Sequence, residues 1–319
     1  LRHAVEKRVL MTERPVACLL SGGLDSSLVA ALANELSLKR NQTPVETYSI
    51  GFAGSEDLKH AKLVAQHIGS KHTEIVCTPQ MFFDAIPHVI HDVETYDTTT
   101  VRASVGNWLL GKYISENSAA KVILNGDGAD EVMGGYLYFH ACPSATEFDQ
   151  ECIRLLGNIH QFDVLRSDKS IASHGLEPRT PYLDNEFVDK YLNLPKSLRY
   201  HKGVKRCEKY VIRDVVQQHA LHLLPESVLY RKKEAFSDGV SGADKAWYEN
   251  IQDLLAERNI TFVAPEDEHL PPTTTEQSYY RAIFDKDYPG ACQLIPYYWM
   301  PKFVKATDAS ARTLKEYAT

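Results

Sequence analysis

Seven residues near the amino terminus, SGGLDSS at 21–27, have side chains suited to holding a phosphate group. Gly22 and Gly23 let the backbone approach an anion closely and take conformations closed to other residues. Hydroxyl groups come from Ser21, Ser26 and Ser27. A helix that begins here would present unpaired N–H groups to negative charge. Asp25 would repel a phosphate unless a cation lay between them, so the loop predicts a site that also binds Mg²⁺.

The loop differs from two other common phosphate-binding patterns. It is neither G-x-x-x-x-G-K-[ST], which transfers a terminal phosphoryl group, nor G-x-G-x-x-G, which binds dinucleotides. A Gly-Gly turn with a serine occurs by chance at many strand–helix junctions, so SGG alone would be weak. All seven residues, between an apolar run at 15–20 and a helix-forming run at 27–36, favour phosphate binding.

A second segment, NGDGADEVMGGY at 125–136, crowds three carboxylates into five residues. They belong to Asp127, Asp130 and Glu131. Such crowding is costly unless a metal ion or a basic side chain neutralises it. A solvated acidic turn would explain the segment in isolation. Beside Asp25 and the phosphate loop, a charge-balanced binding site is the favoured interpretation.

Two more segments offer cations and hydroxyl groups. RKKEAFSDG at 231–239 begins with three cations, Arg231, Lys232 and Lys233, which would ordinarily form a solvated surface. ETYDTTTVRAS at 94–104 contains three threonines and Arg102, whose planar guanidinium suits a carboxylate or a phosphate. A helix N-terminus capped by threonine is equally compatible with this segment.

Strands and helices alternate in the first half of the chain. The predicted strands are 15–20, 46–52, 71–77 and 120–124; the predicted helices are 1–10, 27–36, 55–68, 80–93 (interrupted at Pro87) and 102–116. This alternation predicts an α/β fold, a parallel twisted sheet with helices on both faces. The segment at 125–136 follows a strand, so it would lie in the crevice where such sheets bind ligands.

The second half reads as a helical C-terminal extension. Helices are predicted at 147–167, 185–192, 205–224, 243–258 and 276–285, with a mobile loop at 265–275. We find neither a repeat nor a break in composition. We therefore expect one domain over residues 1–319.

Composition excludes several classes of protein. Among 319 residues, 44% are hydrophobic and 24% charged, which is typical of a globular protein, and no apolar run is long enough to cross a membrane. A net charge of −7 without a basic block argues against a nucleic-acid partner. Six scattered cysteines predict neither zinc nor disulfides and favour a reduced, cytoplasmic setting. The first residue is not Met, so we expect an excerpt or a processed product.

These motifs, together with HGLEPRTPYLD at 174–184 and WMPKFVKATDASARTL at 299–314, resemble the synthetase domain of the asparagine synthetase family across essentially the whole chain. SGGLDSS is similar to the pyrophosphate loop of the N-type ATP pyrophosphatases, which implies an adenine nucleotide alpha hydrolase-like fold. The resemblance implies a carbon–nitrogen ligase that uses Mg²⁺ and ATP to convert aspartate into β-aspartyl-AMP and pyrophosphate. Ammonia then displaces AMP and gives asparagine.

The resemblance also implies roles for individual residues. The ATP site would include Leu20, Ser21, Gly22, Gly23, Asp25, Ser26, Ser27, Ile50, Asn125 and Gly126. Asp25 and Asp130 would accompany Mg²⁺-pyrophosphate. The catalytic group would comprise Lys233, Asp127, Arg102 and Thr99, with Asp163 and Arg166 close to the same site.

Two departures from the family pattern leave questions open. The family's Ser-Gly-Glu-Gly is Asn-Gly-Asp-Gly here, so Asp127 is one methylene shorter than the glutamate associated with forming the intermediate. The usual N-terminal glutaminase domain is absent from these residues, so the nitrogen comes from glutamine, through a glutaminase domain in cis, or from free ammonia. A homodimer is compatible with the resemblance. The alternatives are another amide- or lactam-forming ATP pyrophosphatase and a non-catalytic nucleotide-binding relative.

Overall fold

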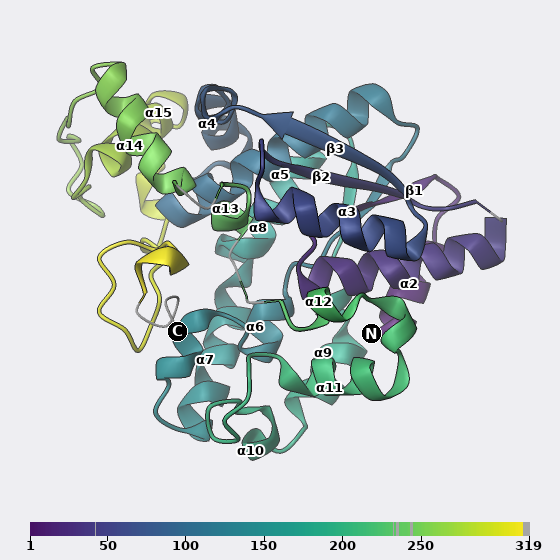
Figure 1. Ribbon diagram of the computed structural model, residues 1–319. Helices are drawn as coiled ribbons and strands as arrows, with labels where there is room; N and C mark the ends of the chain where they lie inside the picture. The colour runs from purple at the N-terminus through teal and green to yellow at the C-terminus, as the bar shows by residue number, and fades with distance from the viewer. Residues whose placement is uncertain (42, 232, 234–235, 243–244, 315–319) are drawn as a thin grey trace.

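A five-stranded parallel sheet in the order β3-β2-β1-β4-β5 lies at the centre of the computed structural model (Figure 1). The structure describes all residues except 42, 232, 234–235, 243–244 and 315–319. Lys232 of the basic triplet and Ala243, the predicted start of a helix, lie outside the described residues.

Four of the five strands are the predicted ones. The strands are β1 (Val16–Leu19), β2 (Glu46–Phe52), β3 (Lys71–Cys77), β4 (Val122–Leu124) and β5 (Glu177–Arg179). β2 and β3 have the predicted bounds, and the parallel sheet is confirmed. β5 was not predicted, because it is three residues long and contains Pro178, which marks strand edges rather than strand interiors.

Apolar side chains cover both faces of the sheet, as β1 shows. Ala17 and Leu19 belong to one buried cluster, whereas Cys18 and Leu20 belong to another. Successive strand residues point to opposite faces, so these two clusters lie on the two sides of the sheet. A strand buried on both faces is continuously apolar, which is why the run at 15–20 does not alternate.

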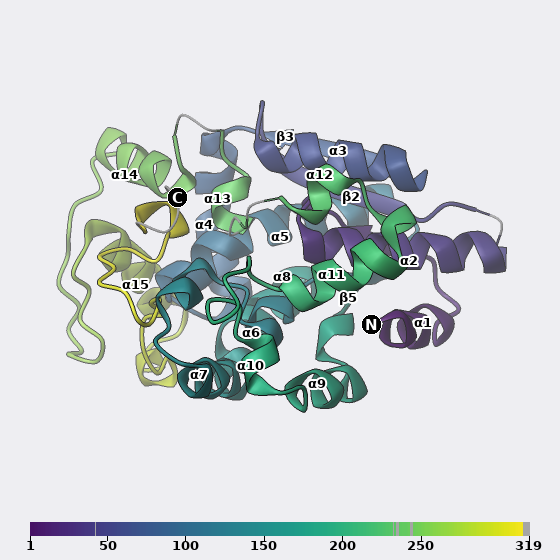
Figure 2. The same cartoon turned by 60° about the horizontal axis from the view of Figure 1, so that its bottom comes forward.

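Helices and short 3-10 segments, joined by loops and turns, surround the sheet in the described chain. The α-helices are α1 (Arg2–Leu10), α2 (Leu24–Asn41), α3 (Glu56–Ile68), α4 (Pro79–Val93), α5 (Thr98–Asn117), α6 (Ala129–Met133), α7 (Ala145–Asn158), α8 (Asp163–Ala172), α9 (Asn185–Leu192), α10 (Lys196–Arg199), α11 (Tyr210–His219), α12 (Glu226–Leu229), α13 (Phe236–Gly239), α14 (Trp247–Glu257) and α15 (Thr275–Asp287). The cluster on one face of the sheet includes side chains of α2, α3 and α12, and the cluster on the other includes those of α4, α5, α14 and α15. The two views show the later helices grouped beside and below the sheet (Figures 1 and 2).

Local signals place several helix ends correctly. Ser55 caps α3 by accepting a hydrogen bond from the Leu58 N–H, and Gly69 ends this helix in the left-handed region at φ 70°. The prediction that Pro87 interrupts a helix was wrong. α4 runs through it because the apolar face of this helix, including Phe83 and Ile86, is fully buried against its neighbours.

Three other predictions of helices need correction. The helix predicted at 147–167 is divided, since Phe162 leaves helical geometry (φ −131°, ψ −94°) between α7 and α8. The helix predicted at 205–224 contracts to α11, and Lys209 precedes it in the left-handed region. α5 is capped by the carboxylate of Asp97, which accepts from the Thr100 N–H at 2.8 Å, rather than by a threonine.

Within the described part of the chain, we find no helix with both the length and the apolar character to cross a membrane.

Candidate active site

A cavity of about 190 Å³ lies at the carboxyl ends of β1, β2 and β4. Parallel strands present their carboxyl ends at one edge of the sheet, so segments far apart in sequence meet there. Its walls include Leu20, Ile50 and Asn125 from the strand ends, together with Asp127 and Lys233. These five residues were predicted from the sequence as parts of one site, and the structure brings them together.

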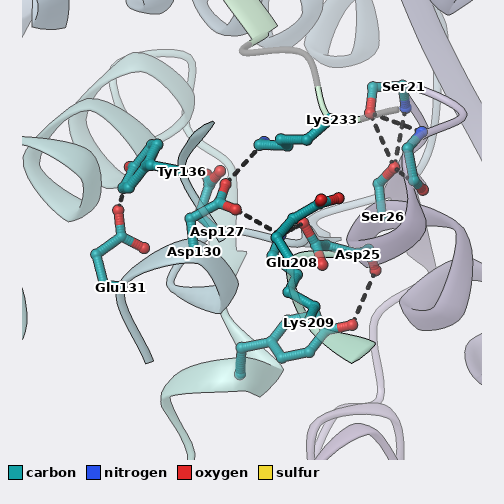
Figure 3. A network of polar contacts seen from close by, with 12 residues as sticks. Ser21, Asp25, Ser26, Asp127, Asp130, Glu131, Tyr136, Glu208, Lys209 and Lys233 are labelled. Carbon is teal, nitrogen blue, oxygen red and sulfur yellow. Dashed lines mark hydrogen bonds and ion pairs between the residues drawn. The ribbon is translucent and has the colours of Figure 1, made fainter. Parts of the chain in front are cut away.

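The phosphate loop begins where β1 ends. The Leu20 N–H donates to the Tyr48 carbonyl at 2.8 Å, which anchors the start of the loop to β2. α2 begins at Leu24, three residues earlier than predicted, so Asp25 and Ser26 belong to its first turn. The Ser26 hydroxyl accepts from the Ser21 N–H at 3.2 Å and closes the loop (Figure 3). The loop therefore presents a helix N-terminus to the cavity.

Two glycines permit this close packing. Gly22 has φ 73°, and a Cβ there would lie 2.3 Å from the Ala61 backbone nitrogen in α3. A Cβ at Gly126 would lie 2.7 Å from the Ser26 backbone nitrogen. Glycine is therefore required at both positions, and it lets α3 and the end of β4 contact the loop directly. Gly22 lies behind the cavity wall, as does Ser27, which is fully buried within α2.

Two carboxylates and two ammonium groups form the charged centre of the cavity. Lys209 Nζ lies 2.5 Å from Asp25 Oδ2 and 2.5 Å from Asp130 Oδ1. Lys233 Nζ lies 2.8 Å from Asp130 Oδ2. Figure 3 shows the side chains of Lys209 and Lys233 converging on Asp130 from different parts of the chain. Asp25, Asp130 and Lys233, which the sequence predicted to belong to one charge-balanced site, thus lie close together in the structure.

Because Asp130 and Lys233 are buried, the pKa of each depends on the charged groups beside it. Burial alone would raise the pKa of Asp130, but the ammonium groups of Lys209 and Lys233 outweigh it and hold that pKa well below its usual range. Burial would likewise lower the pKa of Lys233, but Asp130 and Asp25 outweigh it and raise the pKa. Asp130 and Lys233 are therefore both charged at neutral pH.

Lys209 is the functional residue that sequence reasoning missed. Its side chain is 1% exposed, and it stands at the N-cap of α11 with φ 56°. It falls in the helix predicted at 205–224, where Lys205 looks equally plausible from residue type and spacing. Its burial against two aspartates is a tertiary property, and no local signal could have found it.

A second cluster of charged side chains lies at the cavity wall in addition to the charged centre. Arg166 contacts Asp127 at 3.4 Å and Asp163 at 3.0 Å, so all three predicted neighbours meet. Burial raises the pKa of Asp127, and Arg166 offsets only part of that rise. Glu131 accepts a short hydrogen bond from the Tyr136 hydroxyl. A carboxylate with a raised pKa at the cavity wall is a better proton acceptor than one in water.

Thr99 and Arg102 separate in the structure, although the sequence grouped them. Thr99 lines the cavity, and its hydroxyl donates to the Trp299 carbonyl at 3.2 Å. Arg102 points away from the cavity, with its guanidinium held by Glu276 (2.7 Å) and Asp308 (2.7 and 2.9 Å). The expectation that this guanidinium meets substrate in the cavity is therefore not supported by its position.

The charged centre fits a divalent cation of the magnesium type. Asp25 Oδ1 is buried and has no hydrogen-bond partner among the described residues. Magnesium is commonly bound by one or two carboxylates together with phosphate oxygens and water. Asp25 and Asp130 supply two such carboxylates beside the phosphate loop. The described residues contain no cluster of three or more His, Cys, Asp or Glu side chains, so a cage made by protein alone is not formed there.

Comparison with known proteins identifies relatives of this chain. A family model described as asparagine synthase matches residues 1–150 and 141–302. The chain is 46% identical, over 99% of its length, to a Gallus gallus protein named asparagine synthetase (glutamine-hydrolyzing), and 44% identical to the Homo sapiens protein of that name. Among solved structures, a U34-tRNA thiolase from Methanococcus maripaludis covers 72% of this chain and 75% of its own, at 14% identity and a TM-score of 0.34, too low to support an argument.

A parallel sheet with a glycine–serine loop and paired carboxylates at its carboxyl edge defines the class of the protein, an α/β fold whose sheet edge suits a phosphate ligand. Within that class, the chain belongs to the asparagine synthase family. It spans 56% of the length of the Gallus gallus and Homo sapiens relatives.

Proposed function

We propose that this chain catalyses the ATP-dependent conversion of aspartate to asparagine through a β-aspartyl-AMP intermediate. The observation that carries the proposal is the charged centre, in which Asp25, Asp130, Lys209 and Lys233 converge beside the phosphate loop. The family relationship supports this reaction, and the cavity offers charged groups that the reaction could use. The names of the relatives supply the product, and its transfer to this chain is part of the proposal.

In the first step, the β-carboxylate of aspartate attacks the α-phosphorus of ATP, and pyrophosphate leaves with the electron pair. The first turn of α2 directs backbone N–H groups toward the phosphates, and Gly126 lets the end of β4 pack directly against Ser26 in this turn. Lys233 holds a positive charge where negative charge accumulates on the leaving group. Mg²⁺, held by Asp25 and Asp130, would neutralise the phosphate oxygens further.

In the second step, the nitrogen of ammonia attacks the acyl carbon, the bond from that carbon to the AMP oxygen breaks, and the nitrogen loses a proton. Asp127 lies at the cavity wall with a raised pKa and is the proton acceptor in this proposal. Arg166 contacts its carboxylate and fixes its direction. This contact offers the shorter aspartate a defined position in place of the family's glutamate.

The nitrogen source and the setting of the protein extend the proposal. Because the chain spans 56% of relatives named glutamine-hydrolyzing, we infer that a glutaminase domain in the same polypeptide delivers the ammonia. A reduced cytoplasmic setting accords with six cysteines that are all free. That the protein forms a homodimer is also part of this proposal, and it rests on the family relationship alone.

Pyrophosphate release tests the function directly. The chain is incubated with ATP, Mg²⁺ and an ammonium salt, and each of aspartate, glutamate and other carboxylates is added in turn. We expect pyrophosphate with aspartate alone, and asparagine and AMP with aspartate plus ammonium. Release with a different carboxylate would assign the chain to another amide-forming reaction, and no release with any carboxylate would overturn the catalytic proposal.

A further inference from the structure

The C-terminal strap, residues 299–314, forms one wall of the cavity. Trp299, Pro301, Ala309 and Leu314 all line it. The strap is the yellow segment between α14 and α7 in Figure 1. Residues 299–310, all of which the structure describes, contain neither helix nor strand. Because no backbone ladder holds this wall, its side-chain contacts must position it.

Two tethers on either side of Ala309 hold the strap in place. Asp308 binds the Arg102 guanidinium through both carboxylate oxygens, at 2.7 and 2.9 Å. The Ser310 hydroxyl donates to Asp238 at 2.7 Å. Arg102 is itself buried and fixed by a second bidentate pair with Glu276, so it is a rigid anchor on α5.

The same strap contacts the start of α5 at its other end. The Trp299 N–H donates to Asp97 at 2.7 Å, and the Trp299 carbonyl accepts from Thr99. Trp299 is 7% exposed and packs against Tyr136 and Tyr138 at the cavity wall. The strap thus places apolar surface over the side of the cavity next to Asp127 and Thr99.

We propose that Arg102 and Asp308 are positioning residues that latch the C-terminal strap over the cavity and exclude water from the acyl-adenylate. This inference rests on the proposed function and assigns to Arg102 a role different from substrate recognition. The chemical need is clear. An acyl-adenylate that reacts with ammonia also reacts with water, which is far more abundant. Attack by the water oxygen forms a carbon–oxygen bond, expels AMP with its electron pair, releases a proton and returns aspartate, so that one ATP is spent without product.

Asp308→Asn is the variant of choice, because it leaves the buried pair of Arg102 with Glu276 intact. Loss of a charge-assisted hydrogen bond raises the population of the open strap by roughly tenfold. We expect the ratio of pyrophosphate released to asparagine formed to rise several-fold at saturating aspartate and ammonium, while the rate of pyrophosphate release changes much less. Arg102→Lys keeps the charge without the bidentate geometry and should give an intermediate ratio.

Arg281→Gln is the matched control. Arg281 is 1% exposed and paired with Asp285 in α15, and its hydrogen bonds among the described residues go to Asp285 and the His269 carbonyl rather than to the strap. Its loss should lower stability without changing the ratio of pyrophosphate to asparagine. If Asp308→Asn lowered both products in parallel, with the parent's ratio, the latch would be contradicted.

A second measurement keeps the inference separate from the proposed function. Hydrogen exchange of the ligand-free chain should show roughly tenfold faster exchange in residues 299–314 of Asp308→Asn than in the parent, with α2 and α3 unchanged. Unchanged exchange in the strap would overturn the latch even if the parent makes asparagine. If the parent released no pyrophosphate with aspartate, the proposed function would fail, while the exchange measurement would still decide whether the latch exists.

Discussion

Lys209 connects the two halves of the charged centre. Its ammonium group lies between Asp25 and Asp130, and its side chain is almost completely shielded from water. Two carboxylates held this close repel each other strongly unless a cation separates them. Lys209 therefore offsets the repulsion between the two aspartates and holds them in place before any divalent ion arrives.

Replacing Lys209 should make stability depend on magnesium. We expect Lys209→Met to lower the free energy of unfolding by about 3 kcal/mol in the presence of EDTA, since two buried carboxylates lose their counter-ion. Added Mg²⁺ should recover part of that loss, because the ion can take the place between the carboxylates. Urea denaturation with and without Mg²⁺ measures both effects. Lys205→Met, at an exposed lysine four residues earlier, is the control, and an equal response to Mg²⁺ in both variants would contradict this role.

Lys233 should matter for the chemistry more than for the fold. In Lys233→Ala, Asp130 keeps its ion pair with Lys209, so we expect cooperative unfolding near the parent's midpoint. Pyrophosphate release should fall roughly 100- to 1,000-fold, the loss typical of one preorganised charged group in a transition state. Lys62→Ala, at an exposed lysine on α3, serves as the control. A Lys233→Ala variant with the parent's rate would remove Lys233 from the mechanism.

At the scale of elements, the contact between the phosphate loop and α3 determines the shape of the site. Gly22 allows the loop to turn directly against the Ala61 backbone, and the loop in turn carries the start of α2. A residue with a side chain at position 22 would have to adopt a left-handed backbone conformation, and its Cβ would clash with the Ala61 backbone. Gly23 has neither problem, because a Cβ there would meet only the Ser21 hydroxyl at 3.4 Å.

The two adjacent glycines therefore offer a matched pair of substitutions. Gly22→Ala should lower the free energy of unfolding by about 2 kcal/mol or more, through the left-handed conformation and the displacement of α3. Gly23→Ala should change it by less than about 1 kcal/mol. Thermal and urea denaturation would measure both. Equal effects of the two substitutions would show that the packing against Ala61 does not constrain the loop.

Elements with strong local signals were predictable from the sequence. β2, β3 and α9 have their predicted bounds, and the ends of α3 follow from a serine cap and a closing glycine. β5 and the break at Phe162 were not predictable. Three residues that include a proline carry no strand signal, and the pairing of β5 with β4 arises only in the folded chain.

At the scale of the whole molecule, we expect stability to depend on a buried imidazole outside the cavity, that of His201. His201 is 0% exposed, and neither of its ring nitrogens has a hydrogen-bond partner among the described residues. Burial first, and the neighbouring His140 second, lower the pKa of His201 to about 4, against a smaller opposing effect of Glu208. Its ring packs edge-on against His140 and Phe148.

This lowered pKa predicts acid sensitivity. Between pH 6.5 and 4, the unfolded chain binds a proton at His201 that the folded chain does not, so stability is fully present above pH 6.5 and falls as the pH drops. The contribution is about 3 kcal/mol over this window. His201→Phe should flatten that part of the profile of unfolding free energy against pH. His219→Gln, at an exposed histidine, should leave the slope unchanged, and a slope that survives in His201→Phe would refute the assignment.

The candidate site was predictable to the extent that its residues follow strands. Asn125, Asp127 and Asp130 come directly after β4, so the order of strands and helices alone brings them to the phosphate loop. Arg102 shows the limit of this reasoning. A guanidinium in a segment rich in threonines suggested a ligand contact, but its partners, Glu276 and Asp308, lie far along the chain and are visible only in three dimensions.

The wall formed by the strap also bears on how the protein matures. A chain emerges from the ribosome amino terminus first, and domains form as their residues appear. The strands and the phosphate loop are therefore made early, while Lys209, Lys233 and the strap follow later. Until Lys209 emerges, the protein itself supplies no cation between Asp25 and Asp130, so the carboxyl edge of the nascent sheet closes only at a cost in electrostatic repulsion. A partly synthesised chain should thus be unable to cleave ATP. We expect adenylation activity only after the strap residues have left the ribosome.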